Sequence, residues 1–276
     1  MVDIVDVGSL EWKGTPGHRD GDISMKTLFK GTDGEPNNYW LVLFRVDGVY
    51  DAPLHAHNFE QVRIMLEGAF DFGPQVQDEG TVGYFCEGTR YRQTARGNST
   101  TLLLQCEGAS RSRYVGIDEL RRAAPEMIEA GGRFVEGVYE GPGPDGQTIR
   151  RDGALAVYEW VVGEEPVIPN PYLTGPAIIH PDRLPWGTEP SGIRRRSLGT
   201  FGGRGLSIDV FETDGAGRID YDSGAHGGAC FYVVEGGGAV DGRSFGRGHA
   251  LRIAGGEKAE IDLEKASNVI RLILPR

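Results

Sequence analysis

Cysteine is scarce in this chain, and long apolar runs are missing from it. Its three cysteines, Cys86, Cys106 and Cys230, are odd in number, widely spaced and include no CxxC pair, so neither a disulfide framework nor a structural zinc site is expected. No apolar run reaches the roughly 20 residues that a membrane helix needs. The first residues also lack the basic and apolar regions of a secretory signal. We therefore expect a reduced, cytoplasmic protein without a membrane partner.

Positive charge is also in short supply. The chain has 29 Lys and Arg against 40 Asp and Glu, which gives a formal net charge of −11 at pH 7. Because like charges repel, this balance disfavours binding to phosphate backbones and to anionic lipid surfaces. Nucleic acid is therefore not an expected partner.

Glycine, in contrast, is abundant. The 43 glycines among 276 residues show no G-X-Y period and separate apolar runs of strand length, which is typical of an all-β protein with many tight turns. One helical pattern stands out near residues 117–130, where apolar residues recur at helical spacing, with Pro125 expected to weaken it and Gly131 to end it. After a polar connection over 137–153, strand-like runs resume, the first of them ALAVYEWVV.

The chain repeats its own pattern at one offset. The Glu-Gly pairs at 67–68 and 235–236 each follow an apolar run and lie 168 positions apart. The same offset matches two further pairs of glycines, Gly80 with Gly248 and Gly88 with Gly256. Matching glycines beside matching strand patterns favour two copies of one β unit over a single large sandwich.

The densest group of potential metal ligands lies in residues 51–68. His55 and His57 are one residue apart, so on a strand both imidazoles face the same side and can bind one ion. A turn after them brings back a second strand. Its first residues, Glu60 and Gln61, are the two alternatives for an oxygen ligand.

Strand alternation links that choice to the rest of the pocket. If Gln61 faces inward, so do Arg63 and Met65, and the pocket is polar. If Glu60 faces inward instead, the same face continues with apolar residues and Arg63 lies outside. The spacing described next favours Gln61.

This segment resembles the first motif of the cupin superfamily, which runs Gly, five residues, HxH, three or four residues, Glu, six residues, Gly. The match covers residues 48–68. His55 and His57 fall on the two His positions, Gln61 on the Glu position and Gly68 on the closing Gly, whereas Gly48 is one residue too far from the histidines.

The second cupin motif corresponds to GTVGYFCEGTRY, residues 80–91. Gly88 matches, Cys86 replaces the Pro of the family pattern and Tyr91 replaces its His. The resemblance thus implies a metal shell of His55, His57, Gln61 and Tyr91 around one divalent ion (Fe, Mn, Zn or Ni). Gln93 is an alternative donor to Tyr91, because a phenol binds these metals less readily than an imidazole does.

The resemblance implies an all-β chain of two tandem cupin barrels of the double-stranded β-helix (jelly-roll) type, with a short connecting helix. We expect an N-terminal barrel over residues 1–150 and a second barrel over 151–276. The offset of 168 places no ligand in the second copy, so that barrel is expected to be degenerate. The residues that it aligns with the ligand positions are Ser223, Ala225, Ala229 and Ala259. Barrels of this type often pair, so a homodimer is expected.

The function that this resemblance implies is a metal-dependent enzyme acting on a small oxygenated or carboxylated metabolite, of dioxygenase or of lyase or isomerase type. Arg63 would orient the anionic group of the substrate, and Tyr91 would transfer a proton or hold substrate. Met65 and Gln93 are further candidates for substrate contact. The alternative is a non-catalytic cupin that binds a small molecule.

Overall fold

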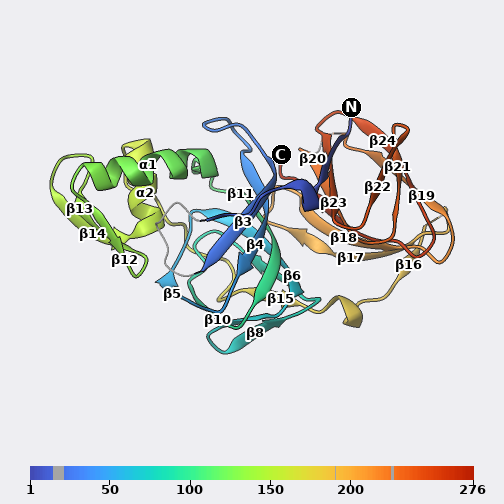
Figure 1. Ribbon diagram of the computed structural model, residues 1–276, viewed down its shortest axis with the longest axis horizontal. Coiled ribbons are helices and arrows are strands. Elements are labelled where there is room, and N and C mark those ends of the chain that lie inside the picture. Colours follow the sequence, from blue (N-terminus) through green and yellow to red (C-terminus); the bar gives the residue numbers. More distant parts are fainter. Residues whose placement is uncertain (15–21, 190, 225–226) are drawn as a thin grey trace. The chain divides into compact units, whose positions relative to one another are not determined.

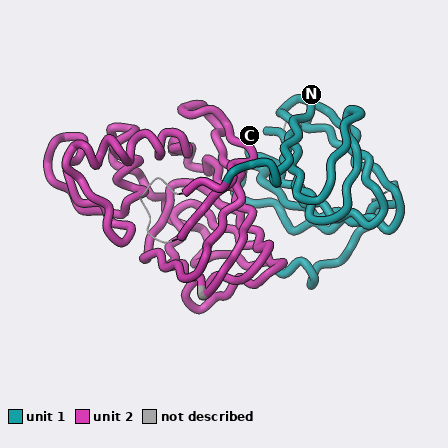
Figure 2. Tube along the Cα trace, viewed as in Figure 1, with its two compact units in different colours: residues 1–11, 180–276 teal, residues 12–179 magenta. Residues whose placement is uncertain are grey.

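The computed structural model describes all residues except 15–21, 190 and 225–226. Two compact units make up the chain: residues 12–179 form the N-terminal unit, and residues 1–11 with 180–276 form the C-terminal unit (Figure 2). Both are built mainly from antiparallel strands (Figure 1), which confirms the all-β prediction. No helix in the described part of the chain is long and apolar enough to cross a membrane.

The N-terminal unit contains a seven-stranded sheet in the order β15-β9-β6-β11-β4-β3-β2 and a four-stranded sheet in the order β5-β10-β7-β8. Their inward faces share a core that includes Trp40, Met65, Phe70 and Leu103. The strands are β2 (Lys13–Gly14), β3 (Ile23–Lys30), β4 (Tyr39–Val46), β5 (Val49–His55), β6 (Phe59–Glu67), β7 (Ala69–Phe72), β8 (Gln75–Asp78), β9 (Val82–Phe85), β10 (Tyr91–Arg96), β11 (Ser99–Glu107) and β15 (Ala177–Ile179).

The C-terminal unit repeats this plan with the sheets β1-β23-β20-β25-β18-β17-β16 and β19-β24-β21-β22. An apolar core that includes Phe211, Phe231 and Leu251 fills the space between them. The strands are β1 (Asp3–Asp6), β16 (Gly187–Thr188), β17 (Arg194–Phe201), β18 (Leu206–Glu212), β19 (Gly217–Asp222), β20 (Gly228–Glu235), β21 (Gly237–Val240), β22 (Arg243–Gly246), β23 (His249–Ala254), β24 (Lys258–Leu263) and β25 (Asn268–Ile273).

The offset of 168 seen in the sequence is also an offset between equivalent strands. It carries β7 onto β21 and β8 onto β22 without a gap. Gly68 and Gly236, which precede β7 and β21, have φ angles of 77° and 75°. A Cβ atom would lie 2.4 Å from the carbonyl oxygen of Asn98 at the first site and 2.4 Å from Ser267 Oγ at the second. Glycine is therefore required at both turns.

The compact units do not divide at the expected boundary between residues 150 and 151. Strand β15 pairs with β9 of the N-terminal unit, and β1 pairs with β23 of the C-terminal unit. The strand that precedes each repeat thus completes the sheet of the other repeat. Single strands of three or four residues carry no signal of their pairing partner, so the sequence did not reveal this exchange.

A helical insertion completes the N-terminal unit. Helix α1 (Ile117–Glu129) confirms the predicted helix, and a three-stranded sheet follows, formed by β12 (Arg133–Val135), β13 (Val138–Pro142) and β14 (Thr148–Asp152). The run ALAVYEWVV, expected as a strand, is part of helix α2 (Gly153–Val162). The helix forms because Asp152 caps it by accepting from the backbone N–H groups of Ala154 and Leu155, and Gly163 ends it in the left-handed conformation.

Candidate functional site

Strands β5, β6 and β10 bring the predicted site residues together. His55, the last residue of β5, pairs with Tyr91, the first residue of β10. Gln61 and Arg63 alternate onto the same face of β6 and are hydrogen-bonded to each other. Glu60 lies on the opposite face of β6, where its charge acts on the buried phenol of Tyr84. Of the two orientations of β6 left open by the sequence, the structure has the one with Gln61 inward.

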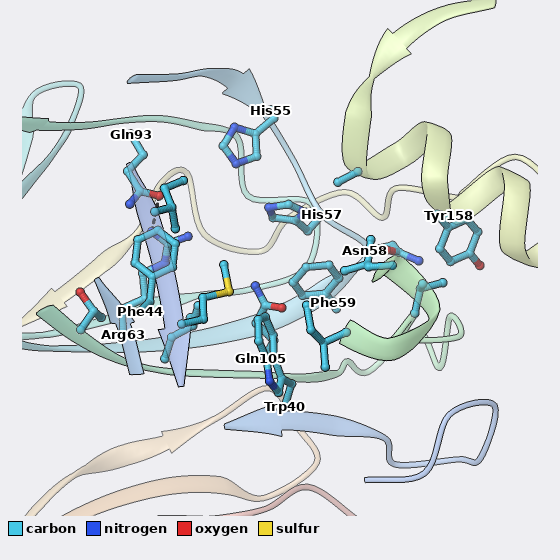
Figure 3. A pocket seen from close by; sticks show the side chains of 18 of the residues that line it. Trp40, Phe44, His55, His57, Asn58, Phe59, Arg63, Gln93, Gln105 and Tyr158 are labelled. Carbon is cyan, nitrogen blue, oxygen red and sulfur yellow. Dashed lines mark hydrogen bonds between the residues drawn. The ribbon is translucent and has the colours of Figure 1, made fainter. Parts of the chain in front are cut away.

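A cavity of about 110 Å³ lies inside the N-terminal unit, beside these strands (Figure 3). Apolar and aromatic side chains from β3, β4, β6, β7 and β11 form most of its wall, and polar side chains including His55, His57, Asn58, Arg63, Gln93 and Gln105 interrupt it. Helices α1 and α2 close one side. The wall includes Trp40, Phe44, His55, His57, Phe59, Arg63, Gln93, Leu120, Leu155 and Tyr158.

His55 and His57 form an imidazole pair on the cavity wall. Their ring centres lie 4.9 Å apart. His55 Nδ1 lies 2.6 Å from the backbone carbonyl oxygen of Pro53, and because that oxygen only accepts, Nδ1 carries the proton of this hydrogen bond. His57 stacks on Phe59 at 4.5 Å between ring centres. Both rings are therefore held in fixed orientations.

Arg63 carries the positive charge of the site, and its side chain is buried, with 7% of the residue exposed. Its Nη2 donates to Gln61 Oε1 at 2.9 Å and to Tyr91 Oη at 3.1 Å, and its Nη1 donates to Gln93 Oε1. The guanidinium also lies over the rings of Phe72, Phe85 and Tyr91, at 4.9 to 5.5 Å from their centres. Among the residues that the structure describes, the acceptors of this buried cation are all neutral.

The structure separates the predicted site residues into two groups. His55, His57, Arg63 and Gln93 line the cavity. Behind them, Gln61 Nε2 donates to Tyr91 Oη at 2.9 Å, and both side chains are almost fully buried. Neither residue is among the described residues of the cavity wall.

Met65 is also absent from the described wall of the cavity. It is fully buried, and its sulfur accepts a long hydrogen bond from Thr101 Oγ1 at 3.5 Å. Met65 is therefore a core residue in this structure and does not contact the cavity.

The two imidazoles suit a divalent ion. Imidazole nitrogen is a common ligand of Zn, Fe, Mn and Ni, and the two ring centres lie 4.9 Å apart on one cavity wall. The described part of the chain places no third His, Cys, Asp or Glu close enough to form a cluster of three with them. His55 and His57 could therefore hold a metal whose other positions are filled by water or substrate oxygens.

Gln61 and Tyr91 fit the metal shell less well, because Arg63 already donates to the oxygen atoms that they would offer. An ion on those oxygens would lie near the guanidinium. At a separation of about 5 Å, the repulsion between a divalent ion and a guanidinium is about 7 kcal/mol for an effective dielectric constant of about 20. In this arrangement both side chains hold Arg63 in place.

Other wall residues were not expected from the sequence. Trp40 and Phe44 come from β4, whose run YWLVLFRV predicted a strand but not its closeness to the histidines. Leu155 and Tyr158 come from α2, which the sequence suggested was a strand. The Asp152 cap and the Gly163 stop are the signals that would have identified the helix.

Among its described residues, the C-terminal unit has no equivalent set of ligands. The offset places Ser223, Ala229 and Ala259 at the ligand positions, all buried, and Ala225 lies outside the described residues. This unit does contain a buried arginine over aromatic rings: Arg271 lies 4.9 Å from the ring centre of Phe211. Its Nη2 donates to the buried carboxylate of Asp209 at 2.7 Å, so its charge is neutralised within the chain.

Comparison with known proteins supports the architecture. No family model and no curated protein sequence matches the chain. Among solved structures, similar folds occur in a protein from Nostoc punctiforme that is provisionally assigned as a dioxygenase (TM-score 0.62, 9% identity, 100% of this chain and 82% of that one). They also occur in the pirin YhhW of Escherichia coli in complex with nickel(II) (0.56, 9%, 100% and 99%).

A third similar structure is the oxalate decarboxylase of Lactobacillus farciminis in its formate complex (TM-score 0.56, 12% identity, 99% of this chain and 86% of that one). All three likenesses extend over nearly the whole chain, through both repeats. The two units, the offset between their strands and these likenesses agree in showing that the chain has the two-barrel, or bicupin, fold.

Proposed function

We propose that the N-terminal barrel is the active site of a metal-dependent enzyme that acts on a small carboxylated metabolite. One observation carries the proposal: the imidazole pair of His55 and His57 and the buried cation of Arg63 face the same cavity. A site of this kind offers a nitrogen lone pair for metal or proton and a donor for an anionic group. The pirin structure with nickel supports the metal by likeness of fold.

Each site residue has a separate role in this proposal. His55 and His57 would hold the ion, which when bound supplies a Lewis acid that polarises a substrate oxygen. Arg63 binds and orients the anionic group. Gln61, Gln93 and Tyr91 fix the guanidinium through hydrogen bonds, so Tyr91 acts as a positioning residue.

The reaction type follows from the charge of the donors. Two neutral imidazoles supply less negative charge to a metal than a shell with a carboxylate, so they stabilise a higher oxidation state poorly. Lyase or isomerase chemistry is therefore favoured over dioxygenase chemistry. A non-catalytic binding protein is the alternative outcome of the tests.

Metal content tests the proposal. We expect elemental mass spectrometry of protein purified without chelator to find one divalent ion per chain, and to find it lost in His55→Ala/His57→Ala. The matched control is His180→Ala/His249→Ala, which also removes two imidazoles but lies in the other unit and should keep the metal. If neither the wild type nor the reconstituted protein binds metal, the metal-dependent enzyme is rejected and the binding protein is favoured.

A further inference from the structure

We infer that the N-terminal cavity takes a small monocarboxylate with an apolar body, and that Arg63 binds its carboxylate without help from a metal. This inference rests on the proposed function, because it names the substrate class of the same site. Three observations carry it: the charge of Arg63, the hydrogen-bond donors left over in the cavity, and the composition of the wall.

The charge of Arg63 is compensated differently from that of Arg271. Both guanidinium groups are buried over aromatic rings, but Arg271 donates to Asp209, whereas the described acceptors of Arg63 are two amides and a phenol. A buried charge without a counter-charge is costly. An anionic ligand would supply at Arg63 the charge that Asp209 supplies at Arg271.

The leftover polar atoms in this part of the wall are donors. Arg63 Nε and Gln93 Nε2 are both buried without a hydrogen-bond partner among the residues that the structure describes, and both residues line the cavity. The orientation of the Gln93 amide follows from its neighbour: because Arg63 only donates, the atom that faces it is the oxygen and the nitrogen faces away. Two unsatisfied donors beside a cation call for a ligand with acceptor oxygens, and a carboxylate has two.

The rest of the wall favours a ligand whose body, apart from its carboxylate, is apolar. Trp40 and Phe59 lie on the side of the cavity away from Arg63 (Figure 3), and Phe44, Leu120 and Leu155 add further apolar surface to the wall. A second carboxylate on the ligand would find no second Lys or Arg among the described residues of the wall, only neutral groups such as Asn58 and Gln105. The site should therefore discriminate against short dicarboxylates.

Size sets the last limit. A cavity of about 150 Å³ is known to hold benzene, so one of about 110 Å³ sets an upper limit of about a single ring or a short branched chain for the apolar body of the ligand. Benzoate and 3-methylbutanoate are suitable probes. Benzamide matches benzoate in shape but carries no charge and points its own donors at Arg63.

The test is isothermal titration calorimetry with the full chain, freed of metal by chelator. We expect benzoate or 3-methylbutanoate to bind at least tenfold more tightly than benzamide and than succinate. Arg63→Gln should weaken monocarboxylate binding by about 100-fold, as expected when one partner of a buried charge pair is removed.

A second variant keeps the inference testable if Arg63→Gln does not fold. Gln61→Glu places a carboxylate where the guanidinium already donates, so it should keep the fold and weaken monocarboxylate binding at least tenfold by competing for Arg63. Equal binding of benzoate and benzamide would overturn the inference. So would the absence of monocarboxylate binding to a folded wild type, or unchanged affinity in both variants.

Failure of this inference can be distinguished from failure of the proposed function. Monocarboxylate binding to the metal-free protein depends on Arg63, whereas metal content depends on His55 and His57. If the chain binds metal but no monocarboxylate, the proposed metal site is supported and only the inferred substrate class is rejected. If the chain binds carboxylate but never takes up metal, the carboxylate site is supported and the metal-dependent enzyme is rejected.

Discussion

Arg63 and Gln61 lie on the same face of strand β6 and are joined by a hydrogen bond of 2.9 Å from Nη2 to Oε1. In the motif that the sequence resembles, the position of Gln61 holds a carboxylate that ligates metal. Here a neutral amide at that position accepts from a guanidinium. An arginine partner thus stands here in place of a metal ligand.

Tyr91→Phe tests whether the phenol positions Arg63 or ligates metal. The change removes the acceptor of Arg63 Nη2 and Gln61 Nε2, which leaves two buried donors without that partner. We expect the free energy of unfolding to fall by about 1 to 3 kcal/mol and benzoate affinity to fall about tenfold, with metal content unchanged. Chemical denaturation, calorimetry and elemental analysis measure the three effects. A loss of metal in a folded Tyr91→Phe protein would restore the phenol as a ligand.

Asp209→Asn should destabilise the C-terminal unit strongly. It removes the negative charge that both Arg195 and Arg271 contact, in a side chain that is 1% exposed. Loss of one partner of a buried charge network costs about 3 to 5 kcal/mol, measured as a lower urea midpoint. The matched control is Asp262→Asn, which breaks the exposed pair with Arg218 and should cost less than about 1 kcal/mol. Equal effects of the two changes would contradict this account.

Deletion of residues 1–9 should weaken the C-terminal unit and spare the N-terminal one. The segment contributes β1 to the sheet through β23 and buries the side chains of Val2 and Val7, each worth about 1.5 to 3 kcal/mol. We expect faster amide hydrogen exchange in β23 and unchanged benzoate affinity. If amide exchange in β23 is unchanged, pairing with β1 does not stabilise that edge of the C-terminal sheet.

Leu155→Trp should block the cavity from the side of helix α2. Leu155 lines the wall, and the larger indole would occupy part of a volume of about 110 Å³. We expect benzoate affinity to fall at least tenfold while the metal content stays that of the wild type. Val161→Trp, on the same helix but outside the described wall, is the control. Retained affinity in Leu155→Trp would place the ligand elsewhere.

Alkaline pH should destabilise the N-terminal unit. Burial raises the pKa of the Tyr114 phenol well above its usual value near 10, and burial together with the charge of Glu60 raises that of Tyr84. Above about pH 10 the unfolded chain therefore releases protons that the folded chain keeps. The free energy of unfolding keeps its full contribution from these phenols below about pH 10 and falls as the pH rises further.

Urea titrations between about pH 9 and about pH 11 measure this fall, and Tyr114→Phe should make it shallower. The hydroxyl of Tyr114 donates to Gln105 Oε1, so the variant is also expected to be less stable at neutral pH. An identical pH dependence in the variant and the wild type would exclude the phenol of Tyr114 as a source.

The sequence predicted the β architecture, the repeat, helix α1 and the residues around the histidines, because periodicity, glycine turns and motif spacing are local signals. It did not predict the exchange of β1 and β15, since pairing partners of short strands are decided by tertiary contacts. It also took α2 for a strand, because its apolar run has no clear period. The partners of Arg63 depend on how β6 and β10, which belong to different sheets, face each other, and the contacting residues lie about 30 positions apart in the chain. The cytoplasmic location and the homodimer stay predictions.

The most direct measurement of the central claim is a crystal structure of the protein with bound benzoate. The account predicts the ring between Trp40, Phe59 and Leu155, with carboxylate oxygens within hydrogen-bond distance of Arg63 Nε and Gln93 Nε2. A carboxylate bound away from Arg63, or a carboxylate of the chain itself paired with that guanidinium, would contradict it.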